Sequence, residues 1–284
     1  MLRTIALLFA AFVAISAGQV VAADDAKPVT PGLHSDIGFA NVDGVSLTLD
    51  AFVPEGEGPF PTVIFVHGGG FMNGDKQSYI KPLFEPVGKA GFAWFTINYR
   101  LAPKYRWPAC GDDVATAVRW VKAHAAEYRV DPRRIALVGE SAGGHLVSWV
   151  GGSTDEALRV AAVVPIYAPH DLEWRVKHKQ ELGGPMKALL DITEMNEESF
   201  KKLRDASPSS RVHKGMPPYL LIHGDNDAQV PYEQSPMFQK QMLAAGNVCD
   251  LITVKGGEHG MGKWKSLGSD YQEQMIAWLK KVMK

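Results

Sequence analysis

The chain has 284 residues, of which 46% are hydrophobic and 21% charged, and its formal net charge at pH 7 is -1. This composition is typical of a folded globular protein and argues against a disordered chain. Because 30 basic residues nearly balance 31 acidic ones, the charge gives no support to nucleic-acid binding or to a polybasic membrane surface. We therefore expect one large domain with a buried core and a small-molecule partner.

The amino-terminal segment differs in composition from the rest of the chain. Arg3 precedes a continuous apolar run, and the small residues that a signal peptidase accepts follow it. This pattern is typical of a secretory signal peptide, with cleavage near Ala22 or Ala23. The run is shorter than the roughly 20 residues that span a bilayer, which disfavours an uncleaved anchor. We expect loss of residues 1–23 and a secreted or periplasmic mature protein, residues 24–284, without stable membrane association.

A hairpin and six buried strands are predicted along the mature chain. Polar and apolar residues alternate from Ile37 to Pro54 around Asp43-Gly44, which is a strong hairpin signal. Six short runs of almost continuous apolar character follow, as expected of strands that are buried on both faces of a sheet. The six runs cover residues 62–67, 92–99, 134–139, 161–167, 219–224 and 250–255.

Segments with helical periodicity separate these runs. Residues 112–128 carry an apolar stripe, with Asp112 and Asp113 at the amino end, where the helix dipole favours acids. The last helix is predicted to begin at a capping box formed by Ser269 and Gln272. Strands that alternate with helices imply right-handed crossover units, and hence an α/β fold with a mostly parallel sheet covered on both faces.

One interval breaks this alternation. Residues 170–210 are charged and helix-prone, show no strand pattern, and are too long for an ordinary connection. We predict a small helical insertion over one end of the sheet. Its apolar residues either face a pocket there or merely pack against the sheet; they include Met186, Leu189, Leu190, Met195 and Phe200.

The stretch from Gly139 to Gly143, "GESAG", lies between an apolar run and a helical segment. In a strand–turn–helix context, Gly-x-Ser-x-Gly indicates a nucleophile elbow, in which a sharp turn exposes the serine hydroxyl. Side chains two positions before or after the serine would collide with neighbouring backbone, which explains both glycines. A simple Gly-Ser turn would not explain the strand before it and the helix after it. We therefore expect Ser141 to be a nucleophile.

A serine hydroxyl becomes a good nucleophile only when a base takes its proton, and the base needs an orienting acid. Asp225 and Asp227 follow one predicted strand and His259 follows the next, so all three belong to the edge of the sheet where chemistry collects. Asp225, directly after the strand, suits a turn-stabilising role. His145, a rival base, is predicted to lie on the far side of the helix. We predict the triad Ser141, Asp227 and His259.

The glycine-rich loop "FVHGGGFMNG" supplies the remaining component of the predicted site, an oxyanion hole. Backbone N–H groups of glycine can approach a ligand closely because no Cβ obstructs them. We expect the N–H groups of Gly69, Gly70 and Ala142 to form an oxyanion hole, and His67 to fix the loop. No pair of histidines shows the spacing of metal ligands, so neither a metal nor another cofactor is implied.

With these motifs the chain resembles the esterase branch of the α/β-hydrolases that includes hormone-sensitive-lipase-like and bacterial feruloyl-esterase-like enzymes. The matching stretches are "HGGG" 67–70, "NYRLAP" 98–103, "GESAGGHL" 139–146, "HGDNDAQVP" 223–231 and "GGEHG" 256–260. Their order and spacing match over almost the whole mature chain. The resemblance implies an α/β-hydrolase fold and a cofactor-free carboxylic-ester hydrolase that forms an acyl-enzyme.

We expect a serine esterase for short or aromatic acyl esters, such as acetyl or feruloyl esters of carbohydrate, with the insertion 170–210 as a lid or pocket wall. One alternative is a serine peptidase of the prolyl-oligopeptidase type, which usually carries a large β-propeller that this chain has no room for. The other is a non-catalytic binding module on the same fold. Such modules typically lose the base or the nucleophile, whereas candidates for both are present here.

Overall fold

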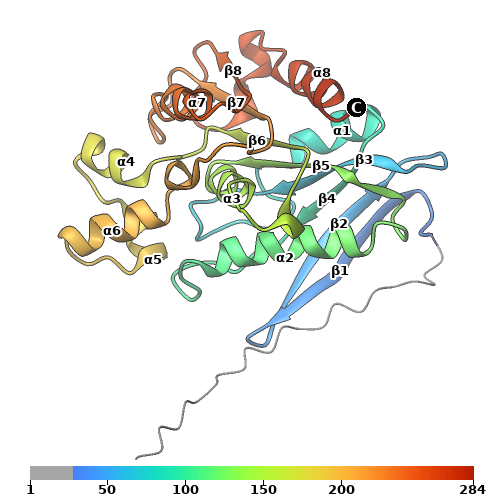
Figure 1. The fold of residues 1–284 in the computed structure, drawn as a ribbon, viewed down its shortest axis with the longest axis horizontal. Coiled ribbons are helices and arrows are strands. Elements are labelled where there is room, and N and C mark those ends of the chain that lie inside the picture. The colour runs from blue at the N-terminus through green and yellow to red at the C-terminus, as the bar shows by residue number, and fades with distance from the viewer. Residues whose placement is uncertain (1–27) are drawn as a thin grey trace, which may run out of the picture.

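The computed structural model describes residues 28–284, so the predicted signal peptide lies outside the described residues. Within this range eight strands form one sheet in the order β1-β2-β4-β3-β5-β6-β7-β8 (Figure 1). The strands are β1 (Gly32–Val42), β2 (Val45–Val53), β3 (Phe60–Val66), β4 (Ala93–Ile97), β5 (Val130–Glu140), β6 (Ala162–Ile166), β7 (Tyr219–Gly224) and β8 (Cys249–Val254). The predicted hairpin forms β1 and β2, which pair antiparallel, and the strands from β3 to β8 are parallel. The predicted strands are therefore confirmed.

Helices cover both faces of the sheet. They are α1 (Phe84–Lys89), α2 (Ala109–Ala123), α3 (Ala142–Gly151), α7 (Gln234–Ala244) and α8 (Tyr271–Val282). In β3, Ile64 and Val66 belong to the apolar cluster that includes α2, α3 and α7, whereas Val63 and Phe65 belong to the cluster with α1 and α8. Burial on both faces explains the continuous apolar runs. In residues 28–284, no helix has the length and apolar character needed to cross a membrane.

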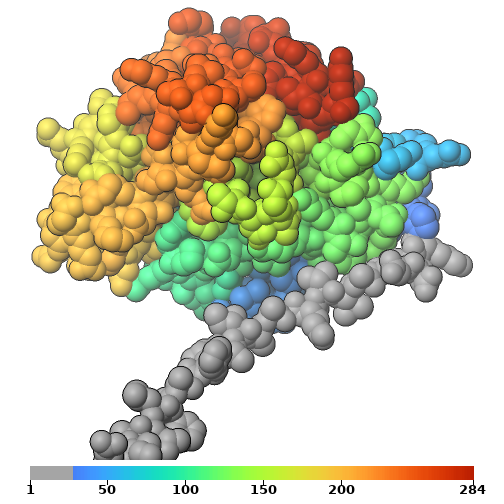
Figure 2. Space-filling model, in the orientation of Figure 1, coloured from blue at the N-terminus to red at the C-terminus, as the bar shows by residue number. Residues whose placement is uncertain are grey.

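The predicted helical insertion forms three helices between β6 and β7. They are α4 (Leu172–Lys179), α5 (Gly184–Leu190) and α6 (Glu197–Asp205). Figure 1 and Figure 2 show them gathered at one end of the molecule, beside the sheet rather than over either of its faces. Their position leaves the two helical layers intact and adds a wall at one end.

The predicted capping box of the last helix is wrong. Asp270 precedes α8, and this helix start has no side-chain cap hydrogen bond. Gln272 is nearly buried, and its side chain instead donates to the carbonyl oxygen of Pro82 at 3.1 Å. The side chain that a local cap would need is therefore engaged in a tertiary contact with the segment just before α1.

A buried ion pair fixes the loop after β4. The Arg100 guanidinium, 8% exposed, donates to the fully buried carboxylate of Asp113 in α2 at 2.8 and 2.9 Å, and to Asp43 at the hairpin turn at 2.9 Å. Asp113 thus binds a charged partner, in addition to the favourable interaction of its carboxylate with the dipole at the amino end of α2. Two residues further on, the Ala102 N–H donates to the carbonyl of Phe71 at 2.9 Å. The ion pair therefore also anchors the glycine-rich loop.

We expect Arg100→Met to lower the free energy of unfolding by about 3–5 kcal/mol, because the Asp113 carboxylate would stay buried without its charged partner. Arg119→Met is the matched control, since Arg119 and its partner Asp155 are 42% and 44% exposed. An exposed pair contributes about 1 kcal/mol or less. Urea unfolding measures both variants. Equal losses would contradict the anchoring role of the buried pair.

Candidate active site

Ser141 occupies a strained turn between β5 and α3. Its φ of +53° lies in a region that residues other than glycine rarely adopt. A Cβ at Gly139 would collide with the carbonyl oxygen of Gly143, and a Cβ at Gly143 would collide with that of Val66. Both glycines are therefore needed for steric reasons, as the motif indicated.

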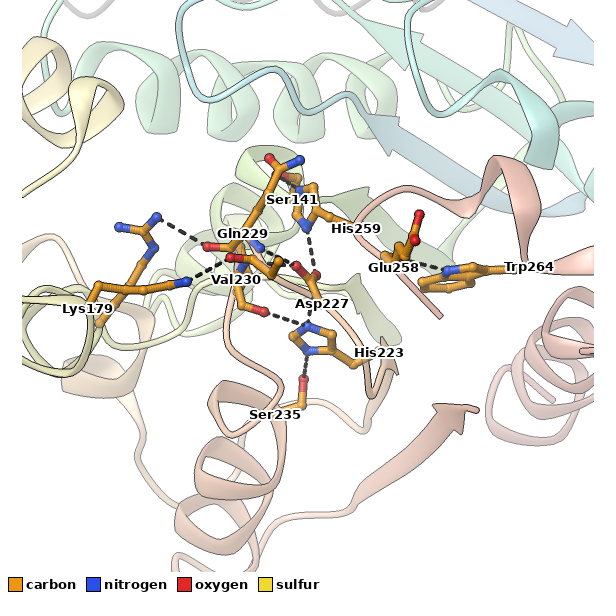
Figure 3. Close-up of polar contacts among 12 residues, drawn as sticks. Ser141, Lys179, His223, Asp227, Gln229, Val230, Ser235, Glu258, His259 and Trp264 are labelled. Carbon is orange, nitrogen blue, oxygen red and sulfur yellow. Dashed lines mark hydrogen bonds and ion pairs between the residues drawn. The ribbon is translucent and has the colours of Figure 1, made fainter. Parts of the chain in front are cut away.

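Three side chains from separate loops meet at this turn. The Nε2 atom of His259 lies 3.0 Å from Ser141 Oγ, and its Nδ1 atom lies 2.7 Å from Asp227 Oδ2 (Figure 3). Asp227 follows β7 and His259 follows β8. The structure thus brings together the three residues of the predicted triad. This arrangement can pass a proton from the hydroxyl to the imidazole.

The Asp227 carboxylate is held ionised by several donors. Oδ1 accepts the N–H groups of Gln229 and Val230 at 2.8 and 2.9 Å, and Oδ2 lies near both His259 and, at 3.2 Å, His223. Burial alone would raise the pKa of Asp227, but the hydrogen bonds to the two histidines and to the Val230 N–H outweigh it and hold the pKa well below its usual range. Asp227 can therefore orient His259 as a permanent anion.

Two neighbours of Asp227 have other roles. Asp225 accepts the Gly256 N–H at 2.7 Å and pairs with Lys255 at 3.0 Å, so it links the loops after β7 and β8, as expected of a turn residue. His223, at the end of β7, is fully buried and its Nδ1 lies 2.8 Å from Ser235 Oγ. Our reading of the sequence missed its contact with the candidate acid. A histidine four residues before an aspartate in "HGDND" was the available signal.

His145 does not compete as the base. It is fully buried in α3, and its Nε2 lies 2.8 Å from the carbonyl oxygen of Ala206. Its ring packs edge-on against Phe71 and Trp107. His145 therefore joins α3 to the segment after α6, which agrees with the structural role expected for it.

The three residues predicted to form an oxyanion hole line the two cavities at Ser141: Gly69 lines one of them, Ala142 the other, and Gly70 both. Gly69 and Gly70 have φ values of +97° and +63°, and Ala142 is the first residue of α3. In the described part of the chain, none of the three N–H groups donates to a protein acceptor. They are therefore available to a negative charge that develops on a substrate.

Ser141 lies where two cavities meet. The larger, of about 600 Å³, has several polar residues in its lining: Asn73, Tyr79, Glu140 and Gln229. The smaller, of about 110 Å³, has a mainly apolar lining of Phe71, Pro169, Pro185, Met186 and Val230, together with Arg175. Gly70, Ser141, Gln229 and His259 border both cavities. A group bound to Ser141 therefore has one small apolar and one large polar space on its two sides.

The helical insertion supplies part of the smaller cavity's wall. Arg175 comes from α4, and Pro185 and Met186 come from α5. Of the apolar residues that the sequence left undecided, Met186 faces the cavity, Leu189 is fully buried in the core, and Met195 is 42% exposed. The insertion therefore both packs against the core and borders the site, through different residues.

Glu140, directly before Ser141, carries a buried carboxyl group beneath the glycine loop. Only 3% of the residue is exposed, and its Oε1 accepts the Gly68 N–H. Burial raises the pKa of Glu140 to about 7, although the Gly68 N–H and the nearby His259 act in the opposite direction. Glu140 occupies the first variable position of the Gly-x-Ser-x-Gly motif, so the motif itself did not predict a buried carboxyl group there.

We expect Glu140 to make the stability depend on pH. The unfolded chain ionises this group near pH 4.5 and the folded chain near pH 7, so the folded state holds the extra proton between these values. Its contribution to stability is complete below pH 4.5 and is lost as the pH rises through 7. The difference corresponds to about 3 kcal/mol.

The variant Glu140→Gln keeps an acceptor oxygen for the Gly68 N–H and cannot ionise. Urea unfolding at pH 5 and pH 8 should show a fall in stability for the wild type that is smaller in this variant by about 2–3 kcal/mol. The same pH dependence in both proteins would refute the assignment.

Known proteins resemble this chain in sequence and structure. "Probable carboxylic ester hydrolase LipM" of Mycobacterium tuberculosis is 32% identical over 195 residues, which are 65% of this chain and 45% of LipM. An ethyl acetate hydrolase of Pseudomonas putida is 25% identical over 265 residues, which are 88% of this chain and 82% of that enzyme. The structure titled "Truncated form of carbohydrate esterase from gut microbiota" has a TM-score of 0.74 at 26% identity, with 90% of this chain and 99% of that chain covered.

The chain spans about half the length of LipM. The BD-FAE family model matches residues 49–242, which is more than half of the chain. This range contains the strands from β3 to β7 and the turn at Ser141. The eight-stranded sheet of the chain, with helices on both of its faces, agrees with the structure of the carbohydrate esterase. The chain therefore has the α/β-hydrolase fold and belongs to the BD-FAE family.

Proposed function

We propose that this protein is a serine esterase that hydrolyses carboxylic esters of short acyl groups through an acyl-enzyme. The observation that carries the proposal is the hydrogen-bonded chain from Ser141 through His259 to Asp227, at the junction of two cavities. The resemblance to enzymes named as ester hydrolases supports the class of reaction. The predicted signal peptide supports an exported enzyme.

In the proposed reaction His259 takes the hydroxyl proton while Ser141 Oγ attacks the ester carbonyl carbon. The carbonyl oxygen becomes negatively charged and faces the N–H groups of Gly69, Gly70 and Ala142. The bond to the alcohol oxygen then breaks, and that oxygen leaves with the proton from His259. Water attacks the acyl-enzyme in the same way, which releases the acid and restores the serine.

The sizes of the cavities suggest which side of the ester each one takes. An engineered apolar cavity of about 150 Å³ holds a benzene ring, so the smaller cavity of about 110 Å³ suits an acetyl or butyryl group better than a feruloyl group. The larger cavity, with its polar lining, suits a bulky hydroxylated alcohol such as a sugar. Of the two substrate classes expected from the sequence, acetyl esters of carbohydrate are therefore favoured.

We expect Ser141→Ala to lower kcat/KM for p-nitrophenyl acetate by about a thousandfold or more, because no other group in the site would form the acyl-enzyme. Ser148→Ala is the matched control. Ser148 lies in α3, the helix that follows Ser141, and is buried, but its hydroxyl donates to the Gly144 carbonyl at 2.8 Å. The Ser148→Ala variant should therefore keep the activity of the wild type. Hydrolysis by folded Ser141→Ala at the wild-type rate would end the proposal.

Met186 should limit the length of the acyl chain. We expect the wild type to prefer p-nitrophenyl acetate and butyrate over octanoate, and Met186→Ala to raise the octanoate-to-acetate ratio of kcat/KM by about tenfold or more, because it enlarges the smaller cavity. Met195→Ala, in the same insertion but exposed, should leave the ratio unchanged. A wild-type preference for octanoate would place the acyl chain elsewhere.

A further inference from the structure

Arg175 is the residue with a permanent charge in the lining of the smaller cavity. It lies in α4 and is partly buried, and the cavity that it borders also reaches Ser141 and Ala142. The other side chains that enclose this space are mainly apolar. A cation in such surroundings lacks much of the hydration that it would have in water, so it gains strongly from an anionic partner.

The protein itself leaves this cation without such a partner. Nη2 of Arg175 donates to the carbonyl oxygen of Gln229 at 3.2 Å, and in residues 28–284 no carboxylate lies within ion-pair distance of the guanidinium. Burial lowers the pKa of Arg175, while Glu181 and Asp227 raise it from further away. Asp227 is already engaged by two histidines and two N–H groups. The guanidinium therefore has donors that remain free for a ligand.

We propose that the smaller cavity binds an acyl group that ends in a carboxylate, of about the length of a succinyl group, and that Arg175 binds this carboxylate. The inference rests on the proposed esterase function and names a class of substrate for the same site. A guanidinium matches a carboxylate in charge and can donate two parallel hydrogen bonds to it. The carboxylate would supply the missing counter-charge, while the short apolar stem would contact Met186 and its neighbours.

A purely structural role for Arg175 can be separated from this role. Lys179, one turn later in α4, donates to the carbonyl oxygen of Ala228 at 2.7 Å. Ala228 directly precedes Gln229, whose carbonyl oxygen Arg175 contacts, and Figure 3 shows Lys179 next to this loop. Both cations thus hold the same loop, but Lys179 lines neither cavity. Lys179→Met is therefore a matched control for loss of the loop contact.

The test compares p-nitrophenyl hemisuccinate with p-nitrophenyl butyrate, which have acyl chains of equal length, after subtraction of the uncatalysed rates. We expect the wild type to favour the hemisuccinate in kcat/KM. Arg175→Met should lower the hemisuccinate-to-butyrate ratio by about tenfold to a hundredfold, the range for a hydrogen bond between charged groups. Arg175→Lys should retain part of the ratio, and Lys179→Met all of it.

A wild-type preference for butyrate would overturn the carboxylate subsite, as would equal falls of the ratio in Arg175→Met and Lys179→Met. Either result would leave the esterase proposal in place. Absence of hydrolysis of both esters by the wild type would instead end the proposed function, and the subsite with it. The wild-type ratio requires no variant, so it decides the question even if Arg175→Met does not fold.

Discussion

The close contact between the amino end of α3 and the end of β3 is the constraint on which the site depends. A Cβ at Gly143 would meet the carbonyl oxygens of Val66 and His67. Only glycine lets a helix begin so near to the backbone of a neighbouring strand. Because the glycine-rich loop starts where β3 ends, this contact also brings the loop to Ser141. A larger residue here would separate the hydroxyl from the N–H groups of that loop.

Two carboxyl groups at this edge of the sheet behave in opposite ways. Asp227 is surrounded by donors, including the buried ring of His223, and its pKa lies below the usual range. Glu140 has the Gly68 N–H as a donor and lies deeper, so burial dominates and its pKa rises to about 7. The number of donors around each group, rather than its position in the chain, decides its charge. The Asp227 carboxylate therefore remains an anion beside His259, and the Glu140 carboxyl group can hold a proton beside Ser141.

The helical insertion between β6 and β7 shapes the space next to Ser141, but none of its residues belongs to the hydrogen-bonded chain from Ser141 through His259 to Asp227. Pro185 and Met186 narrow the smaller cavity, and Arg175 adds the charge within it. All three come from the inserted helices rather than from the sheet. The edge of the sheet carries Ser141, Asp227 and His259, and the added segment sets the shape of the pocket. This division allows the pocket to change while the geometry of the three side chains stays fixed.

The sequence by itself determined the strands, the elbow at Ser141 and the three residues that meet there. Continuous apolar runs indicated the strands, the paired glycines indicated the elbow, and the ends of parallel strands indicated the three residues. All of these signals follow short-range rules of backbone geometry. It failed where a distant segment competed for a side chain, as when Gln272 bound the carbonyl of Pro82 instead of capping its helix. Only the tertiary structure decided the contact of His223 with the candidate acid, the sizes of the two cavities and the place of Arg175 in the lining of the smaller one. These features depend on distances between segments far apart in the chain, and the periodicity of a sequence does not encode such distances.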